Sequence, residues 1–132
     1  MADLRGQGGL IPDIPTLLDE RTLAALHDDF ASTGDLDELA GLIRTFVERG
    51  AKQVAEIAAL ADSGDAEELR KAAHKLKGSS RTLGASLVGE VAAKIEDAGG
   101  AGDVAAARRA VPELEVVFSR TRGALLDASN RW

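Results

Sequence analysis

The chain has 132 residues, of which 45% are hydrophobic, and a formal net charge of −6 at pH 7. This length fits one domain with a single core, and the acidic balance argues against a general binder of nucleic acids or anionic membranes. There is no cysteine, which excludes disulfides and thiolate chemistry. No apolar run reaches the length of about eighteen residues that a transmembrane helix needs, and the first residues lack the apolar stretch of a signal peptide. We therefore predict a soluble, cytoplasmic protein.

Glycine and proline interrupt the first residues, and we predict a flexible N-terminal arm over residues 1–14, followed by one helical domain over residues 15–130. Within that domain, glycine-aspartate pairs stand at residues 34–35, 64–65 and 102–103. Each pair offers a glycine to end one helix and an aspartate to cap the next. The pairs therefore predict where helices begin.

Between these breaks, apolar residues recur at steps of three and four, which predicts amphipathic helices. The expected helices span residues 17–30, 36–62, 66–83 and 86–100, with a last one from about residue 103 onward. Ser86 is a candidate cap of the fourth helix, and Pro112 is expected to kink or split the fifth. No strand pattern competes, and short connections favour antiparallel neighbours. We predict an all-α fold, an antiparallel up-and-down four-helix bundle with a short extra N-terminal helix.

The third predicted helix carries His74, one of two histidines in the chain. At roughly 100° per residue, its buried stripe is expected to consist of Leu69, Ala73, Leu76, Ser80 and Leu83. His74 lies about 140° from Leu69 on this wheel, so its imidazole is expected to project outward. Gly78 follows one turn later. A glycine there costs a helix about 1 kcal/mol relative to alanine, but it keeps the flank of the histidine open.

Cations surround this histidine, and no acidic residue lies between Leu69 and Gly89. The basic residues of the stretch are Arg70, Lys71, Lys75, Lys77 and Arg81. Such a patch is expected to attract an acidic partner and to stabilise a phosphoryl group on the ring. The simpler interpretation is a solvated helix face, and we favour it for His27, which has no comparable glycine or basic neighbours. The two histidines have no metal-ligand spacing, so no metal site is predicted.

The run His74-Lys75-Leu76-Lys77-Gly78-Ser79-Ser80, followed by Leu83-Gly84-Ala85, resembles the signature of histidine-containing phosphotransfer (HPt) domains. The resemblance extends from about Leu17 to Leu126 and includes Phe46-Val47-Glu48, Gly64-Asp65 and Lys94-Ile95-Glu96. In that family a histidine accepts a phosphoryl group from an aspartyl phosphate on a receiver domain and passes it to another receiver. The resemblance therefore implies a phosphorelay intermediate of two-component signal transduction.

The resemblance also implies roles for single residues. His74 is the expected phosphoacceptor, Lys77 is expected to neutralise the phosphoryl oxygens, and Gly78 is expected to let the loops of the receiver reach the ring. Where the family often has a glutamine that binds the other ring nitrogen, this chain has Glu96, a possible acceptor of the ring N–H. Receiver binding is expected to use this patch and the neighbouring fourth helix, with contacts from Arg70, Lys71, Lys75, Gly78, Ser79 and Arg81.

The sequence contains no motif for ATP binding or kinase activity, so we predict a phosphocarrier and not an enzyme. No cofactor is expected, and Mg²⁺ would be supplied by the receiver. The expected partners are response-regulator receiver domains, a hybrid histidine kinase or both, with no nucleic acid and no membrane, and the chain is expected to be a monomer. Two alternatives stay open. One is a helical adaptor that binds an acidic partner through the same patch without being phosphorylated, and the other is the phosphoacceptor module of a larger kinase.

Overall fold

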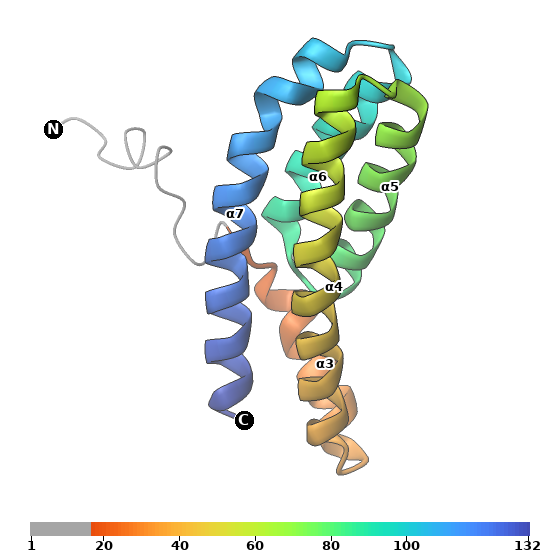
Figure 1. Ribbon diagram of the computed structural model, residues 1–132. Coiled ribbons are helices and arrows are strands. Elements are labelled where there is room, and N and C mark those ends of the chain that lie inside the picture. Colours follow the sequence, from red (N-terminus) through yellow and green to blue (C-terminus); the bar gives the residue numbers. More distant parts are fainter. Residues whose placement is uncertain (1–16) are drawn as a thin grey trace, which may run out of the picture.

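The computed structural model describes residues 17–132, and these residues are helical, with no strand among them (Figure 1). The helices are α3 (Glu20–Ser32), α4 (Leu36–Ser63), α5 (Ala66–Thr82), α6 (Ser86–Gly100) and α7 (Val104–Asn130). The predicted arm over residues 1–14 lies outside the described part of the chain. None of the helices within residues 17–132 is both long enough and apolar enough to cross a membrane.

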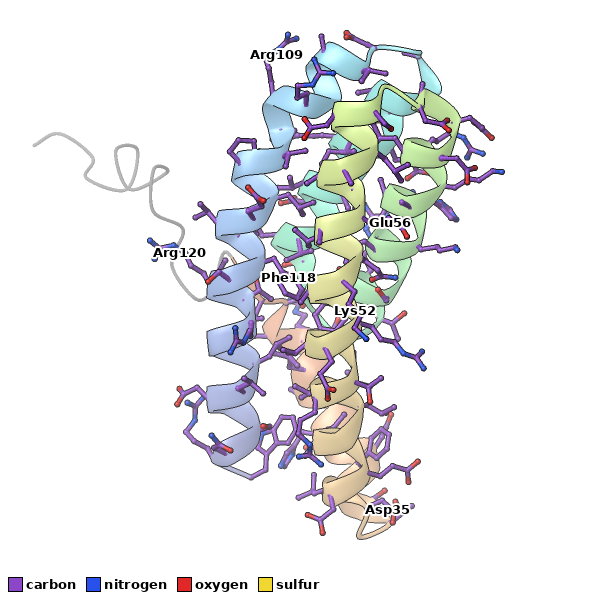
Figure 2. The ribbon with its side chains drawn as sticks, in the orientation of Figure 1. Asp35, Lys52, Glu56, Arg109, Phe118 and Arg120 are labelled. Atoms are coloured by element: carbon purple, nitrogen blue, oxygen red, sulfur yellow. The ribbon has the colours of Figure 1, made fainter. Side chains whose placement is uncertain are left out.

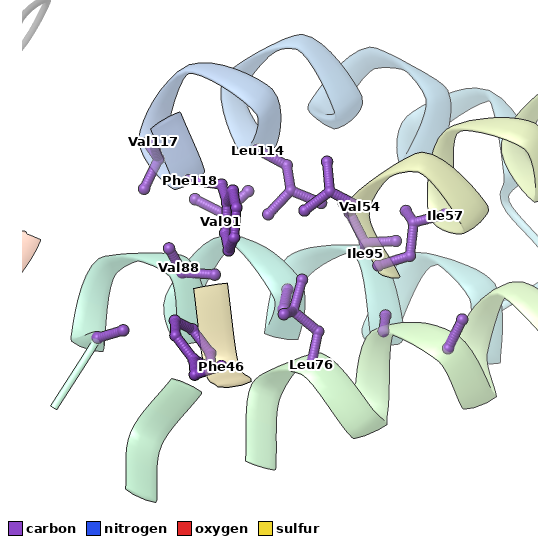
Figure 3. Packing of buried hydrophobic residues seen from close by; sticks show 14 of the residues in the cluster. Phe46, Val54, Ile57, Leu76, Val88, Val91, Ile95, Leu114, Val117 and Phe118 are labelled. Atoms are coloured by element: carbon purple, nitrogen blue, oxygen red, sulfur yellow. The ribbon is translucent and has the colours of Figure 1, made fainter. Parts of the chain in front are cut away.

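The four longer helices lie side by side, and after each tight turn the chain runs back along the preceding helix (Figure 1). α5 packs against α6, α6 against α7, and α4 against both α5 and α7, while the shorter α3 packs on α4. Their apolar faces meet in one core, of which Figure 3 shows the centre. Ile57, Leu76 and Leu114, from three different helices, are all fully buried there. The apolar residues whose spacing predicted amphipathic helices form the buried faces of α4 and α7, so that prediction is confirmed.

Aspartates and glycines set most of the helix ends. Gly34, Gly64, Gly84 and Gly102 all have positive φ, between 72° and 82°, a conformation that L side chains rarely adopt. Asp65 and Asp103 cap α5 and α7 by accepting hydrogen bonds from backbone N–H groups of the first turn. Asp35, by contrast, precedes α4 without making a side-chain cap.

One predicted helix start and one predicted helix cap were wrong. α3 begins at Glu20, not at residue 17, because the Asp19 side chain accepts hydrogen bonds from the backbone of Arg21 and Thr22 and so caps the helix there. Ser86 does not cap α6 but is its first residue, and its hydroxyl donates to the Leu17 carbonyl at 3.4 Å. Leu17 and Leu18 nevertheless remain in the core.

α7 continues through Pro112 without a break, so the proline does not split the helix. In Figure 1 the first turns of α7 lean away from the axis of the rest. Pro112 lacks the N–H that would bond to the carbonyl four residues earlier, which is a recognised cause of such a bend. The Arg108 guanidinium in this leaning segment donates to the carbonyl of Ala61 at 2.9 Å and so ties it to the end of α4.

Glycines allow two close approaches between helices. Phe118 lies between α7 and α4 (Figure 2), and its ring occupies the space that a Cβ at Gly50 would need, only 2.5 Å from that position. A Cβ at Gly99 of α6 would lie 2.9 Å from the carbonyl oxygen of Ala66 and 3.0 Å from the backbone nitrogen of Arg70. α5 and α6 therefore touch backbone to backbone at Gly99.

Replacing Gly99 with alanine is expected to lower the free energy of unfolding by about 1–2 kcal/mol, because overpacking typically costs about 1–3 kcal/mol and alanine returns up to about 1 kcal/mol of helix propensity. Gly123→Ala is the matched control. No described atom lies within 4 Å of a Cβ at Gly123, so that variant should gain up to about 1 kcal/mol. Urea denaturation measures both values, and equal stability of the two variants would contradict the close contact at Gly99.

Candidate functional site

The buried and exposed faces of α5 are those that the sequence predicted. Leu69, Ala73, Leu76 and Ser80 are fully buried, while the His74 side chain is 62% exposed. Because the apolar residues recur with the helical period, they form one stripe that packs into the core, and His74 lies outside that stripe. The imidazole therefore stands on the surface of the molecule, held by a helix whose position the core fixes.

Glu96 of α6 holds the exposed ring in place. Its Oε2 lies 2.8 Å from Nδ1 of His74, although the two residues are 22 positions apart in the sequence. The Glu96 side chain is only 16% exposed, so the carboxylate sits in the seam between α5 and α6. Two glycines of α6 keep this seam narrow: Gly99 touches the start of α5, and a Cβ at Gly89 would lie 3.1 Å from Arg81 Cγ.

The contact with Glu96 also sets the tautomer of the ring. A carboxylate only accepts hydrogen bonds, so in the neutral imidazole Nδ1 donates its hydrogen to Glu96. Nε2 is then the nitrogen that carries the available lone pair. Nε2 is thus the one ring nitrogen available as a nucleophile, because Nδ1 is engaged by Glu96.

Lys77 completes a chain of three charged or polar groups. Its Nζ lies 2.6 Å from Oε1 of Glu96, and its side chain is 22% exposed. The Lys77 ammonium holds the pKa of the Glu96 carboxyl below its usual range, helped by His74 and opposed by burial. Glu96 therefore stays ionised throughout the neutral pH range. In this structure the ammonium of Lys77 is engaged by Glu96.

The basic patch is partly neutralised by acids that precede it. Arg70 donates two hydrogen bonds to Glu67, both at 2.8 Å, and Lys71 forms an ion pair with Glu68 at 3.2 Å. Among the described residues, Lys75 and Arg81 have no such ion pair, and both are exposed. Sequence analysis missed this because it counted acids only within residues 69–89, whereas the partners lie one turn upstream.

The surface beside the ring is open at Gly78. No described atom lies within 4 Å of a Cβ at this position. The neighbouring Ser79 is half-buried and donates to the Leu76 carbonyl at 3.2 Å. The helix backbone is thus uncovered one turn after His74, as predicted.

Sequence analysis missed a groove between α4 and α5. Its lining is mainly apolar and includes Leu42, which is 44% exposed. The groove is lined by Leu42, Thr45, Phe46, Arg49, Gln53, Ser79, Thr82 and Leu83. Because Ser79 follows Gly78, the groove begins directly beside the open backbone. The prediction had placed docking on α5 and α6, and the position of Leu42 beside the buried stripe of α4 was the available signal.

His27 lies away from this site, near the C-terminus. Its Nδ1 lies 3.4 Å from Oδ1 of Asp28, and the centroid of its ring lies 5.5 Å from the centroid of the Trp132 ring. Its side chain is 36% exposed, which agrees with the predicted surface or partly buried residue. Within residues 17–132, no three His, Cys, Asp or Glu side chains are grouped so that they could hold a metal ion.

Known proteins share the fold of this chain. The family model of the Hpt domain matches residues 41–126. The solved structure of histidine-containing phosphotransfer protein B from Pseudomonas aeruginosa PAO1 superposes with a TM-score of 0.81 at 28% identity, over 91% of this chain and 99% of that one. The histidine-containing phosphotransfer protein ZmHP2 from maize has the same fold, with a TM-score of 0.80 at 21% identity over 97% of each chain. No curated protein sequence matched.

The family match spans more than half of the chain, and the helices that it covers include the one that carries His74. The resemblance seen in the sequence is therefore confirmed: the chain belongs to the Hpt domain family and is a phosphorelay intermediate of two-component signal transduction.

Proposed function

We propose that His74 is the phosphoacceptor, which takes a phosphoryl group from an aspartyl phosphate on a receiver domain and passes it to another receiver. One observation carries the proposal: Nδ1 of His74 is held by Glu96 at 2.8 Å while the side chain is 62% exposed. Among residues 17–132, Nε2 of this exposed side chain has no hydrogen-bond partner, and the open backbone of Gly78 lies one turn further along the helix.

The transfer requires little from this domain beyond position. The Nε2 lone pair forms a bond to phosphorus as the bond between phosphorus and the aspartyl oxygen breaks, and the aspartate leaves as a carboxylate. The ring then carries a positive charge, which the Glu96 carboxylate stabilises through Nδ1–H. Phosphoryl transfer depends mainly on alignment and neutralisation of charge, so the receiver would contribute Mg²⁺ and this chain would act as a carrier, not as an enzyme.

The docking surface follows from the same geometry. The exposed Lys75 and Arg81 attract an acidic partner, Gly78 admits its loops, and the groove that begins at Ser79 offers an apolar surface. Arg70 and Lys71 add to the patch at its edge, each shared with a glutamate. We propose that response-regulator receivers, a hybrid histidine kinase or both bind here, and that the groove and not only α6 forms the interface.

The scaffold in this proposal is an antiparallel up-and-down four-helix bundle of α4 to α7, with α3 as the short additional N-terminal helix. The contacts between α4 and α5, α5 and α6, α6 and α7, and α4 and α7 support it. We propose that the chain acts as a cytoplasmic monomer and needs neither a cofactor of its own nor a nucleic acid or membrane.

Replacing His74 with glutamine is expected to abolish labelling by a phosphorylated receiver, because the amide has no lone pair of comparable nucleophilicity. Incubation with a ³²P-labelled receiver measures this, and the wild-type label should be lost in acid and kept in base. His27→Gln is the matched control and should be labelled normally. Labelled His74→Gln, or an unlabelled wild type that still binds receivers, would contradict the proposal, the latter in favour of an adaptor.

Replacing Gly78 with alanine is expected to separate stability from function. The free energy of unfolding should rise by up to about 1 kcal/mol, because the methyl group meets no described atom and alanine favours the helix. The rate of phosphotransfer should nevertheless fall at least about tenfold, which corresponds to about 1.4 kcal/mol of lost docking or alignment. Gly123→Ala should gain similar stability and transfer normally, and transfer at the wild-type rate by Gly78→Ala would refute the role of the open backbone.

Replacing Leu42 with aspartate is expected to raise the KM for a receiver about tenfold, since it places a charge in the apolar groove, and a factor of ten corresponds to about 1.4 kcal/mol. Val116, which is 51% exposed on α7, provides the comparison, because Val116→Asp adds the same charge to another exposed apolar position. Transfer kinetics at varied receiver concentration measure both variants. Equal values of KM would exclude the groove from the interface.

A further inference from the structure

Lys77 is held in the seam between α5 and α6 and does not extend into solvent. Its ammonium lies 2.6 Å from one oxygen of Glu96, and the other oxygen of the same carboxylate lies 2.8 Å from Nδ1 of His74. The side chains of Lys77 and Glu96 are only 22% and 16% exposed. The carboxylate thus stands between the ammonium and the imidazole.

We infer that Lys77 is a positioning residue that acts on His74 through Glu96: it neutralises the carboxylate, so that Glu96 orients the ring without driving its protonation. The inference rests on the proposed role of His74 as the nucleophile. It differs from the role that the resemblance implied, in which Lys77 contacts the phosphoryl oxygens directly.

The physical need for such a residue follows from the choice of glutamate. An anionic neighbour favours the charged form of an imidazole, and the imidazolium has no lone pair at Nε2 with which to attack phosphorus. A glutamine in this place would accept the ring hydrogen without that effect. In this chain two residues together give a neutral acceptor, because the positive charge of Lys77 offsets the negative charge of Glu96.

The burial of the pair makes the effect strong. Solvent screens ion pairs at the surface, such as that between Lys94 and Glu113, whose side chains are 64% and 50% exposed. The pair of Lys77 and Glu96 is much less exposed, so screening is weaker and an unpartnered carboxylate there would be costly. Lys77 is therefore the main charge that determines what Glu96 does to the ring.

The other charged groups near Glu96 are already engaged or more distant. From α5, Arg70 interacts mainly with Glu67 and only weakly with Glu96, and Lys71 is paired with Glu68. From α7, Glu113 is occupied by Lys94 of α6 itself. These pairs leave Lys77 as the cation in direct contact with Glu96.

The titration of the ring nitrogens tests this inference without any phosphotransfer. Two-bond ¹H–¹⁵N spectra of protein labelled with ¹⁵N-histidine report the tautomer and the protonation of each imidazole at every pH. The set comprises wild type, Lys77→Met, Glu96→Gln and the double variant. Methionine keeps the aliphatic stem of the lysine, Lys94→Met makes the same change at the exposed pair, and the ring of His27 is an internal reference.

In Lys77→Met, protonation of the His74 ring is expected to move to higher pH by about one unit, the size that loss of one nearby charge produces. In the Glu96→Gln background, Lys77→Met should move the protonation of the His74 ring by less than about a third as much. The reason is that the carboxylate through which Lys77 acts is absent there. Lys94→Met should leave both rings unchanged. A shift of equal size in both backgrounds, or no shift in either, would overturn the inference.

Phosphotransfer kinetics give a second readout. In Lys77→Met the fall of the rate on the acidic side should move to higher pH, while the rate at alkaline pH stays within about twofold of wild type. An alkaline rate that falls at least about tenfold in both Glu96 backgrounds would show that Lys77 contacts the phosphoryl group instead. If no variant, wild type included, is labelled, the proposed function fails, and the titration still decides the role of Lys77.

Discussion

The site depends on how closely α6 approaches α5. At Gly99 the backbones of the two helices touch, and at Gly89 the Arg81 stem fills the place of a missing side chain. Between these two positions in α6 lies Glu96, whose carboxylate Oε2 is 2.8 Å from Nδ1 of His74. The residue that holds the ring thus lies in the seam that these two glycines keep narrow.

The positive charge that is not paired with a glutamate around the His74 ring is smaller than a count of lysines and arginines indicates. Glutamates engage Arg70, Lys71 and Lys77, each within 3.2 Å. The positive surface that has no such ion pair among residues 17–132 is smaller and lies around Lys75 and Arg81, near the apolar groove that Leu42 lines. In the proposed complex, these charges would favour fast encounter and correct orientation, whereas contact with the groove would prolong the complex.

The helices and the outward direction of His74 could be predicted because both follow from the period of apolar residues along one helix. Helix starts were less predictable: the cap at Asp19 and the place of Ser86 depend on which of several polar side chains reaches a free N–H. The groove at Leu42 and the ion pair of Lys77 with Glu96 arise between helices, so no single-helix pattern contains them. For Glu96 itself only the family resemblance gave the position.

The ring contact between His27 and Trp132 has a practical consequence. Trp132 is the only tryptophan of a chain that has no tyrosine, so almost all of its ultraviolet emission comes from one indole. That indole packs where α3 meets the end of α7, and it lines neither the groove nor the seam at Glu96. The protein thus carries a native optical reporter of whether its terminal helices are docked, and its signal is expected to be insensitive to events at the phosphorelay surface.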